Sequence, residues 1–185
     1  SRKQYRDKNS DQFLKQLTSK YGESYYIPEG GGNYVAVQGC QDIAEYVEWL
    51  SGSGGKYLAM ACGTGTTMAG LITGLKAPET PVKVLGISVL KAEGFLEREV
   101  HSWVEDIGSE QTVTWEVLQD YHCGGYAKSN DKLKRFISQF TCWSNIPIEP
   151  IYTGKLFYGL FDQISSGKFP KGSEILAIHS GGVIA

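Results

Sequence analysis

The sequence lacks the features that mark membrane proteins and nucleic-acid-binding proteins. No stretch approaches the ~18 consecutive apolar residues of a membrane span, and residues 1–6 have no apolar core of a signal peptide. Charge of one sign is also missing, because 18 basic residues face 20 acidic residues and the formal net charge is -2. Such a chain has no global attraction for nucleic acid or an anionic membrane. We therefore expect a small-molecule ligand rather than either partner.

Cysteines are few and isolated. The four cysteines stand singly and form no C-x-x-C pair, so the chain has no dense disulfide framework of the kind that stabilises small secreted domains. A reducing, cytoplasmic setting is the expectation. Cys62 and Cys123 are expected to be small core residues rather than nucleophiles. No cluster of His, Cys, Asp and Glu has metal-ligand spacing, so no metal is expected.

Glycine, in contrast, is abundant. The 23 glycines of this 185-residue chain are about twice the usual share of ~7%, and they separate strand-like apolar runs from helical patterns. Helices are predicted near residues 13–21, 42–50, 68–75, 92–106, 131–142 and 156–164, and strands near residues 56–61, 82–90, 113–117, 148–152 and 175–179. Because the strands are apolar on both faces, the chain is predicted to be an α/β protein with a three-layer, mostly parallel twisted sheet and helices on both faces. Such sheets bind ligands beyond the carboxyl ends of their strands.

The most informative segment is residues 61–70, where a predicted buried strand turns into a helix. Closely spaced glycines let backbone N–H groups point inward, the helix N-terminus adds partial positive charge, and threonine hydroxyls add donors. The segment lacks the Gly-Lys-Ser/Thr ending of a Walker A loop, and Met68 replaces the third glycine of a dinucleotide-binding fingerprint. A phosphate site and a tight turn without a ligand both remain open from this loop alone.

The G-T-G-x-T-x-x-G pattern formed by Gly63, Thr64, Gly65, Thr67 and Gly70 resembles the phosphate-binding loop of the fold type II pyridoxal-phosphate enzymes. This group includes the tryptophan synthase β subunit and cysteine synthase. The resemblance implies that the chain belongs to the large domain of this fold and that its cofactor is pyridoxal 5'-phosphate.

Four further segments narrow the resemblance. Residues 27–33, 124–128, 151–155 and 178–182 occur in the order and at roughly the spacing of the 1-aminocyclopropane-1-carboxylate deaminase and D-cysteine desulfhydrase branch. The resemblance implies that residues 1–28 are a remnant of the smaller, substrate-side domain and residues 29–185 an incomplete large domain. It also implies a small amino acid as substrate and a homodimer.

The resemblance assigns roles residue by residue. Residues matching Gly63, Thr64, Gly65, Thr66 and Thr67 hold the cofactor phosphate, and tyrosines matching Tyr126 and Tyr152 face the substrate. The residue matching Thr153 contacts the pyridine nitrogen, and the one matching Ser180 lies beside the ring. Each position also has a structural interpretation: the tyrosines could be half-buried packing residues, and Thr153 and Ser180 could be helix-cap or turn residues. His179, at the end of an apolar strand, is expected to be a structural histidine rather than a base.

Two departures from the deaminases favour a desulfhydrase. Enzymes that open the cyclopropane ring carry a glutamate at the position of Thr153, whose carboxylate keeps the pyridine nitrogen protonated, and a bulky apolar residue at the position of Ser180. A neutral hydroxyl suits β-elimination, in which a good leaving group departs from the β carbon. The resemblance thus implies a lyase or deaminase that yields a 2-oxo acid and ammonia, with D-cysteine desulfhydrase-like chemistry favoured.

The lysine that anchors the cofactor in this family lies upstream of every matched segment. Lys91, Lys128 and Lys155 are expected to be solvated, and none lies in a family lysine motif. The chain also has no initiator methionine. It is therefore expected to be a fragment that does not turn over substrate alone. Two alternatives are a non-catalytic phosphate- or nucleotide-binding domain and a ligand-free structural fragment.

Overall fold

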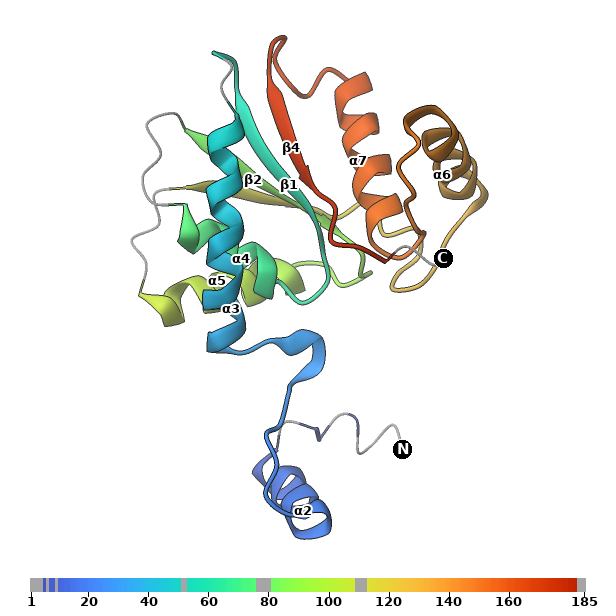
Figure 1. The fold of residues 1–185 in the computed structure, drawn as a ribbon. Coiled ribbons are helices and arrows are strands. Elements are labelled where there is room, and N and C mark those ends of the chain that lie inside the picture. The colour runs from blue at the N-terminus through green and yellow to red at the C-terminus, as the bar shows by residue number, and fades with distance from the viewer. Residues whose placement is uncertain are drawn as a thin grey trace.

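The structure is a computed structural model that describes residues 5, 7–8, 10–50, 53–75, 81–108 and 113–182. Its centre is a four-stranded parallel sheet with the strand order β3-β2-β1-β4 (Figure 1). The strands are β1 (Lys56–Cys62), β2 (Val82–Ser88), β3 (Thr114–Leu118) and β4 (Glu174–Ile178). This arrangement confirms the predicted α/β class and the parallel sheet.

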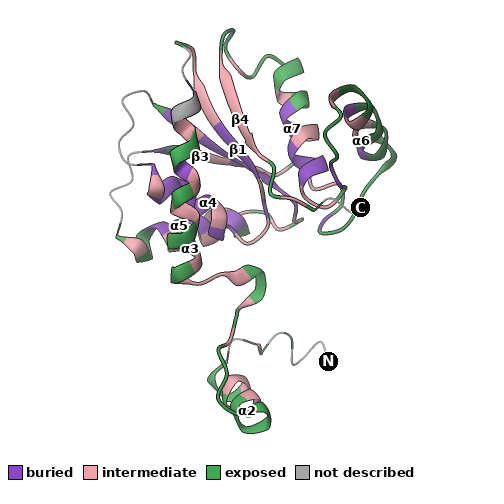
Figure 2. Cartoon of the chain, in the orientation of Figure 1, coloured by how far each residue is buried: buried purple, intermediate pink, exposed green. Residues whose placement is uncertain are grey.

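Helices cover both faces of the sheet. One face packs against α4 (Thr66–Gly74) and α5 (Phe95–Ile107), with α3 (Tyr34–Gln41) packed on α4. The other face packs against α7 (Thr153–Ser165), beside which lies α6 (Asp131–Ser144). The alternation along β1 explains the two layers, because Leu58, Met60 and Cys62 join one apolar cluster while Ala59 joins the other. Side chains of successive strand residues point to opposite faces, so the predicted three-layer architecture is confirmed (Figure 2).

The strand order places a topological switch point between β1 and β4. From β1 the chain moves outward through β2 to β3, and it then returns to pair β4 with the other edge of β1. At such a point the connections leave in opposite directions and open a crevice beyond the carboxyl ends of the two strands. The segments that follow Cys62 and Ile178 border this crevice.

The N-terminal helix α2 (Asp11–Tyr21) stands apart from the sheet and contains no buried residue. Ser10 caps its start and Gly22 ends it. Of residues 1–28, positions 1–4, 6 and 9 lie outside the described residues. The domain boundary between residues 28 and 29 stays a prediction.

Two sequence predictions differ from the structure. Residues 148–152 are not a strand but an irregular segment and a turn that lead into α7. Pro147 and Pro150 lack the N–H groups that a central strand donates to its neighbours, and this explains the error. The helix predicted at residues 42–50 is a 3-10 helix, η2 (Asp42–Trp49), and it continues the unpredicted α3, which Asn33 caps.

A second 3-10 helix, η1 (Glu29–Gly31), lies in the predicted glycine loop before α3. The remaining helices and strands lie within a few residues of their predicted positions. Among the described residues, no helix is both long and apolar enough to cross a membrane.

The close contact between α3 and α4 depends on a glycine. A Cβ atom added to Gly70 would lie 2.4 Å from Cys40 Cβ and 2.7 Å from the carbonyl oxygen of Val37. Real Cβ atoms do not approach other atoms so closely, so α3 can pack on α4 only where the latter has no side chain. Gly70 of the sequence pattern is therefore a packing glycine.

We predict that Gly70→Ala lowers the free energy of unfolding by about 1–3 kcal/mol, because the added methyl group overpacks the α3–α4 contact. Gly39→Ala is a matched control, since Gly39 is also helical and an added Cβ meets nothing within 4 Å. That control should raise stability by about 0.5–1 kcal/mol through helix propensity. Urea denaturation measures both changes, and equal stability of the two variants would contradict the packing role.

Candidate functional site

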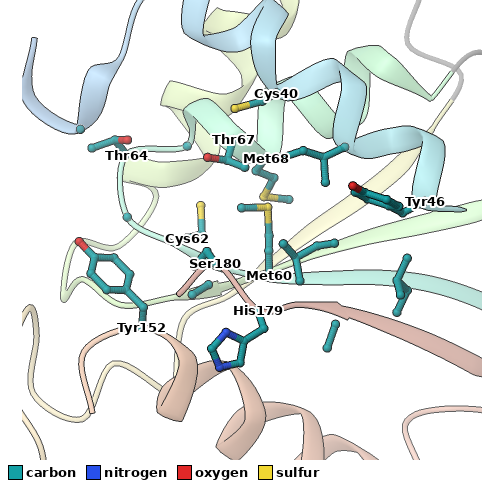
Figure 3. Close-up of a pocket in the computed structure, with 18 residues that line it drawn as sticks. Cys40, Tyr46, Met60, Cys62, Thr64, Thr67, Met68, Tyr152, His179 and Ser180 are labelled. Carbon is teal, nitrogen blue, oxygen red and sulfur yellow. The ribbon is translucent and has the colours of Figure 1, made fainter. Parts of the chain in front are cut away.

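A pocket of about 780 Å³ opens at the switch point between β1 and β4. The loop after β1, the end of β4 and the start of α7 contribute to its wall. The predicted site residues among those that line it are Gly63, Thr64, Gly65, Thr67, Tyr152 and Ser180. Figure 3 shows Thr64 and Tyr152 toward one end of the pocket and Tyr46 at the opposite end. Met60, Met68 and Leu176 make part of the wall apolar.

The loop between β1 and α4 turns sharply at Gly65. Its φ of 81° is left-handed, and an added Cβ would lie 3.0 Å from Val100 Cγ2. Only glycine adopts this conformation without strain. No side chain caps the N-terminus of α4, whereas Ser10, Asn33 and Asn130 cap α2, α3 and α6. The first N–H groups of α4 therefore lack a side-chain acceptor like the oxygen atoms that accept from the first N–H groups of α2, α3 and α6.

Threonine hydroxyls surround this helix start. The Oγ1 atoms of Thr64 and Thr66 lie 3.4 Å apart, and Thr64 and Thr67 both line the pocket. Thr66 is buried and is not part of the pocket wall. The loop thus gathers backbone N–H groups and hydroxyls at the positive end of a helix, a donor set that suits a phosphate monoester.

Tyr152, which lines the pocket, forms a pair with Tyr126. The hydroxyl of Tyr152 donates a hydrogen bond to the hydroxyl of Tyr126 at 3.2 Å, and the two rings meet edge to face with centroids 5.9 Å apart. An added Cβ on Gly63 would lie 3.4 Å from the ring of Tyr152, which places this ring against the glycine loop. Tyr126 is 54% exposed and does not line the pocket.

The environment of Tyr152 keeps its hydroxyl protonated. Burial raises its pKa to about 12, and the hydrogen bond to Tyr126 adds to the increase. At neutral pH the group therefore keeps its proton, which it donates to Tyr126, and it is a poor base.

Thr153 and Ser180 occupy different environments. Thr153 is fully buried and does not line the pocket. Its Oγ1 accepts the N–H of Glu149 at 3.0 Å and lies 3.3 Å from Glu149 Oε1, to which it donates. Ser180 is exposed and lies on the pocket wall beyond β4. Of these two residues, only Ser180 directly faces the space that a ligand would fill.

Sequence reasoning missed Glu149, which holds the start of α7. Its carboxylate is only 8% exposed and accepts the N–H groups of Ile151, Tyr152 and Thr153 at 2.5, 2.7 and 2.8 Å. An acidic side chain is favourable at a helix N-terminus. The residue could have been found as an acidic cap four positions before Thr153, but the predicted strand over residues 148–152 obscured it.

Lys155 contradicts the prediction that the three lysines near loops are solvated. Lys91 and Lys128 are exposed, but Lys155 is 0% exposed. Its Nζ donates to the carbonyl oxygens of Gly125 at 2.9 Å and Val89 at 3.3 Å. Desolvation lowers the pKa of its ammonium group, against smaller opposing effects of Cys123 and Glu149. The sequence of α7 does not show which backbone carbonyl groups a lysine will contact, so the burial of Lys155 was not predicted.

The other candidate nucleophiles and bases are either buried or half-buried thiols or a histidine that is hydrogen-bonded to the backbone. Burial raises the pKa of Cys62 to about 12 and also raises the pKa of Cys123, so neither thiol is activated. The ring Nε2 of His179 lies 2.8 Å from the carbonyl oxygen of Pro147, and its Nδ1 accepts the N–H of Gly181. In the part of the chain that the structure describes, no three His, Cys, Asp or Glu side chains gather to hold a metal ion.

Comparisons with known proteins agree with this geometry. A putative 1-aminocyclopropane-1-carboxylate deaminase of Pyrococcus furiosus is 30% identical over 95% of this chain and 55% of its own length. A D-cysteine desulfhydrase of Salmonella schwarzengrund is 29% identical over 87% of this chain and 51% of its own. The crystal structure of an aminocyclopropane-carboxylate deaminase homologue superposes with a TM-score of 0.81 at 27% identity, over 95% of this chain and 55% of that one.

The chain therefore spans about half the length of the curated relatives it matches. The model of the family described as pyridoxal-phosphate dependent enzyme matches residues 4–181, which is nearly all of the chain. The match includes the glycine loop, the tyrosine pair and the end of β4. This chain belongs to the pyridoxal-phosphate dependent enzyme family.

Proposed function

We propose that the start of α4 holds the phosphate of pyridoxal phosphate in a protein that acts on a small amino acid. The observation that carries the proposal is the helix N-terminus without a side-chain cap, which opens into a pocket that Tyr152 also lines. Gly63, Gly65 and the first turn of α4 would supply backbone N–H groups, and Thr64, Thr66 and Thr67 hydroxyls. This donor set fits a phosphate without a lysine or arginine.

Pyridoxal phosphate, when bound, withdraws electrons from the carbon that bears the amino group of an amino acid. The residues of this chain would orient the substrate and hold its protons. Tyr152 has a pKa of about 12 and so keeps its hydroxyl proton at neutral pH. On substrate binding this hydroxyl would turn from Tyr126 to the substrate and donate a hydrogen bond or a proton to it. Before the substrate binds, Tyr126 accepts from Tyr152 and holds that hydroxyl in place.

For the reaction itself we favour β-elimination from a D-cysteine-like amino acid. The relatives include proteins named for both desulfhydrase and deaminase activity. Thr153 has a neutral hydroxyl that is already hydrogen-bonded to Glu149, and Ser180 leaves a small polar side chain on the pocket wall. Neither supplies the negative charge next to the ring nitrogen that ring opening of a cyclopropane would call for. A homodimer is part of the same proposal.

Assays with two substrates test the reaction. A protein that joins this chain to the lysine-bearing part of the family, loaded with pyridoxal phosphate, should release hydrogen sulfide and pyruvate from D-cysteine faster than it forms a four-carbon 2-oxo acid from 1-aminocyclopropane-1-carboxylate. The 185-residue chain alone should turn over neither substrate. The reverse preference would contradict the desulfhydrase proposal and favour the deaminase. Free pyridoxal phosphate at the same concentration is the control for non-enzymatic elimination.

We predict that Gly65→Ala weakens pyridoxal phosphate binding by about 10–150-fold, the equivalent of one charged hydrogen bond of about 1.5–3 kcal/mol. The added methyl group meets Val100 and displaces the loop. Gly172→Ala is the matched control, because Gly172 has a similar φ of 86° and no atom within 4 Å of an added Cβ.

Equilibrium dialysis of pyridoxal phosphate, pyridoxal and adenosine monophosphate gives the affinities. Equal pyridoxal phosphate affinity of both glycine variants would contradict the phosphate site. Tighter binding of the nucleotide would support a non-catalytic nucleotide-binding domain instead.

In a protein that also contains the lysine-bearing part, we predict that Tyr152→Phe lowers kcat by about 10²–10⁴-fold, the usual contribution of a general acid or base, with little change in cofactor affinity. Tyr158→Phe, in the aromatic cluster on the opposite face of the sheet, should leave kcat unchanged.

An alkaline titration of tyrosinate absorbance gives a second readout for Tyr152. Because its pKa is raised from 10 to about 12, the folded protein keeps this proton where an unfolded chain releases it. Its stabilising effect is complete below pH 10 and is lost as the pH approaches 12. Tyr126→Phe removes the hydrogen-bond acceptor and should lower the midpoint. A midpoint near 10 for Tyr152 in the unmodified protein would contradict its burial.

A further inference from the structure

Lys155 is the largest fully buried side chain among the described residues. A buried ammonium group is expensive unless hydrogen bonds compensate for its lost hydration. An exposed or apolar residue would avoid this penalty on the first turn of α7. A lysine at this position therefore needs an explanation that apolar packing does not give.

The ammonium group connects two segments that are far apart in the sequence. One carbonyl partner belongs to Val89, just beyond β2, and the other to Gly125, in the loop over residues 122–128. An added Cβ on Gly125 would lie 3.6 Å from Lys91 Cβ, so this loop also packs on the segment after β2. Lys155 thus lies where the loop meets the end of the sheet.

Both segments lead directly to the proposed site. Gly125 immediately precedes Tyr126. The N–H of Val89 donates to the carbonyl of Cys62 at 3.0 Å, and an added Cβ on Gly63 would lie 3.7 Å from Val89 Cγ2. Lys155 itself lies one helical turn after Tyr152 on α7. One ammonium group therefore links the tyrosine pair to the glycine loop.

The loop over residues 122–128 needs contacts with the rest of the protein to keep its conformation. Cys123 and Ala127 adopt left-handed φ angles of 53° and 54°, which side chains other than glycine rarely adopt. Within the loop, the N–H of Gly125 donates to the His122 carbonyl, the N–H of Lys128 to the Gly125 carbonyl and the N–H of Gly124 to His122 Nδ1, and each of these bonds spans at most three residues. The carbonyl of Gly125 accepts both the Lys128 N–H and the Lys155 ammonium group. Strained conformations persist when the surrounding structure determines them.

A second interpretation of a buried lysine is a nucleophilic amine. The position argues against it, because Lys155 has no exposed surface and does not line the pocket. Its donors point to two carbonyl groups rather than to open space.

We propose that Lys155 is a positioning residue that holds Tyr126 against Tyr152 by tying the loop over residues 122–128 to the end of β2. The importance of this arrangement for turnover rests on the proposed function of the tyrosine pair. The structural link itself does not, because it involves no cofactor.

Hydrogen exchange of the protein without cofactor tests the link. Lys155→Met keeps the length of the side chain but removes its donors, and Lys155→Arg restores charged donors. Lys132→Met, at an exposed position on α6, is the control. We expect amides of residues 122–128 to exchange at least about tenfold faster in Lys155→Met, with α7 and the sheet unchanged. Lys155→Arg should recover part of the protection.

Three outcomes would overturn the proposal. Unchanged exchange of residues 122–128 in folded Lys155→Met would show that the loop needs no such tie. Faster exchange throughout the sheet would show a general role in stability. Reduction with borohydride in the presence of pyridoxal phosphate, followed by peptide mapping, would reveal a nucleophilic role if Lys155 itself carried the label.

Turnover of the loaded protein that also contains the lysine-bearing part then separates this proposal from the proposed function. If both hold, Lys155→Met lowers kcat to the level of Tyr126→Phe, and the double variant is no slower than either single variant. If exchange in the loop rises but kcat is unchanged, the link exists and the role of the tyrosine pair in turnover is wrong. Binding of pyridoxal phosphate by Gly65→Ala and its control Gly172→Ala tests the phosphate site independently.

Discussion

The burial of β1 on both faces is the constraint on which the rest of the structure depends. The strand lies inside the sheet, with α4 on one face and α7 on the other. Its polar backbone groups are satisfied by β2 and β4, so its side chains have no reason to be polar. Groups that can bind a ligand must therefore lie beyond its end, where Gly63, Thr64 and Gly65 follow.

The same constraint shows why much of the fold could be predicted from the sequence. Strands covered on both sides are continuous apolar runs, and the short glycine-rich breaks between them mark the loops. The loop before α4 could be predicted because its glycines and threonines are neighbours in the sequence and act together at one helix start. The order of the strands, however, is not local, and it decides which loops meet at the pocket.

The errors have a common physical origin. Residues 148–152 are apolar enough for a strand, but two prolines and the carboxylate of Glu149 commit their backbone to the start of α7. Lys155 has the polarity of a surface residue, yet its position on the inner side of α7 buries it. In both cases the partners are backbone groups, and a sequence pattern of side chains carries little information about them. Thr153, likewise, is turned toward Glu149 rather than the pocket.

Around the pocket, charged side chains support the backbone instead of facing the cavity. Glu149 and Lys155 lie on either side of the first residues of α7, and each is satisfied by N–H or carbonyl groups. The charged groups of Glu149 and Lys155 therefore stay outside the pocket, while hydroxyls and N–H groups line it. Two buried charges of opposite sign can thereby fix the direction of a helix without competing for a ligand.

The glycine and threonine loop before α4 contains no ionisable side chain between Gly63 and Thr67. A phosphate held there would keep the same protein donors across the whole physiological pH range. Its retention would then depend on the ionisation of the ligand, whose second proton leaves near pH ~6, and not on the titration of any protein group. Between acidic and alkaline compartments the charge of the phosphate would change, while the hydrogen-bond donors of the loop would not.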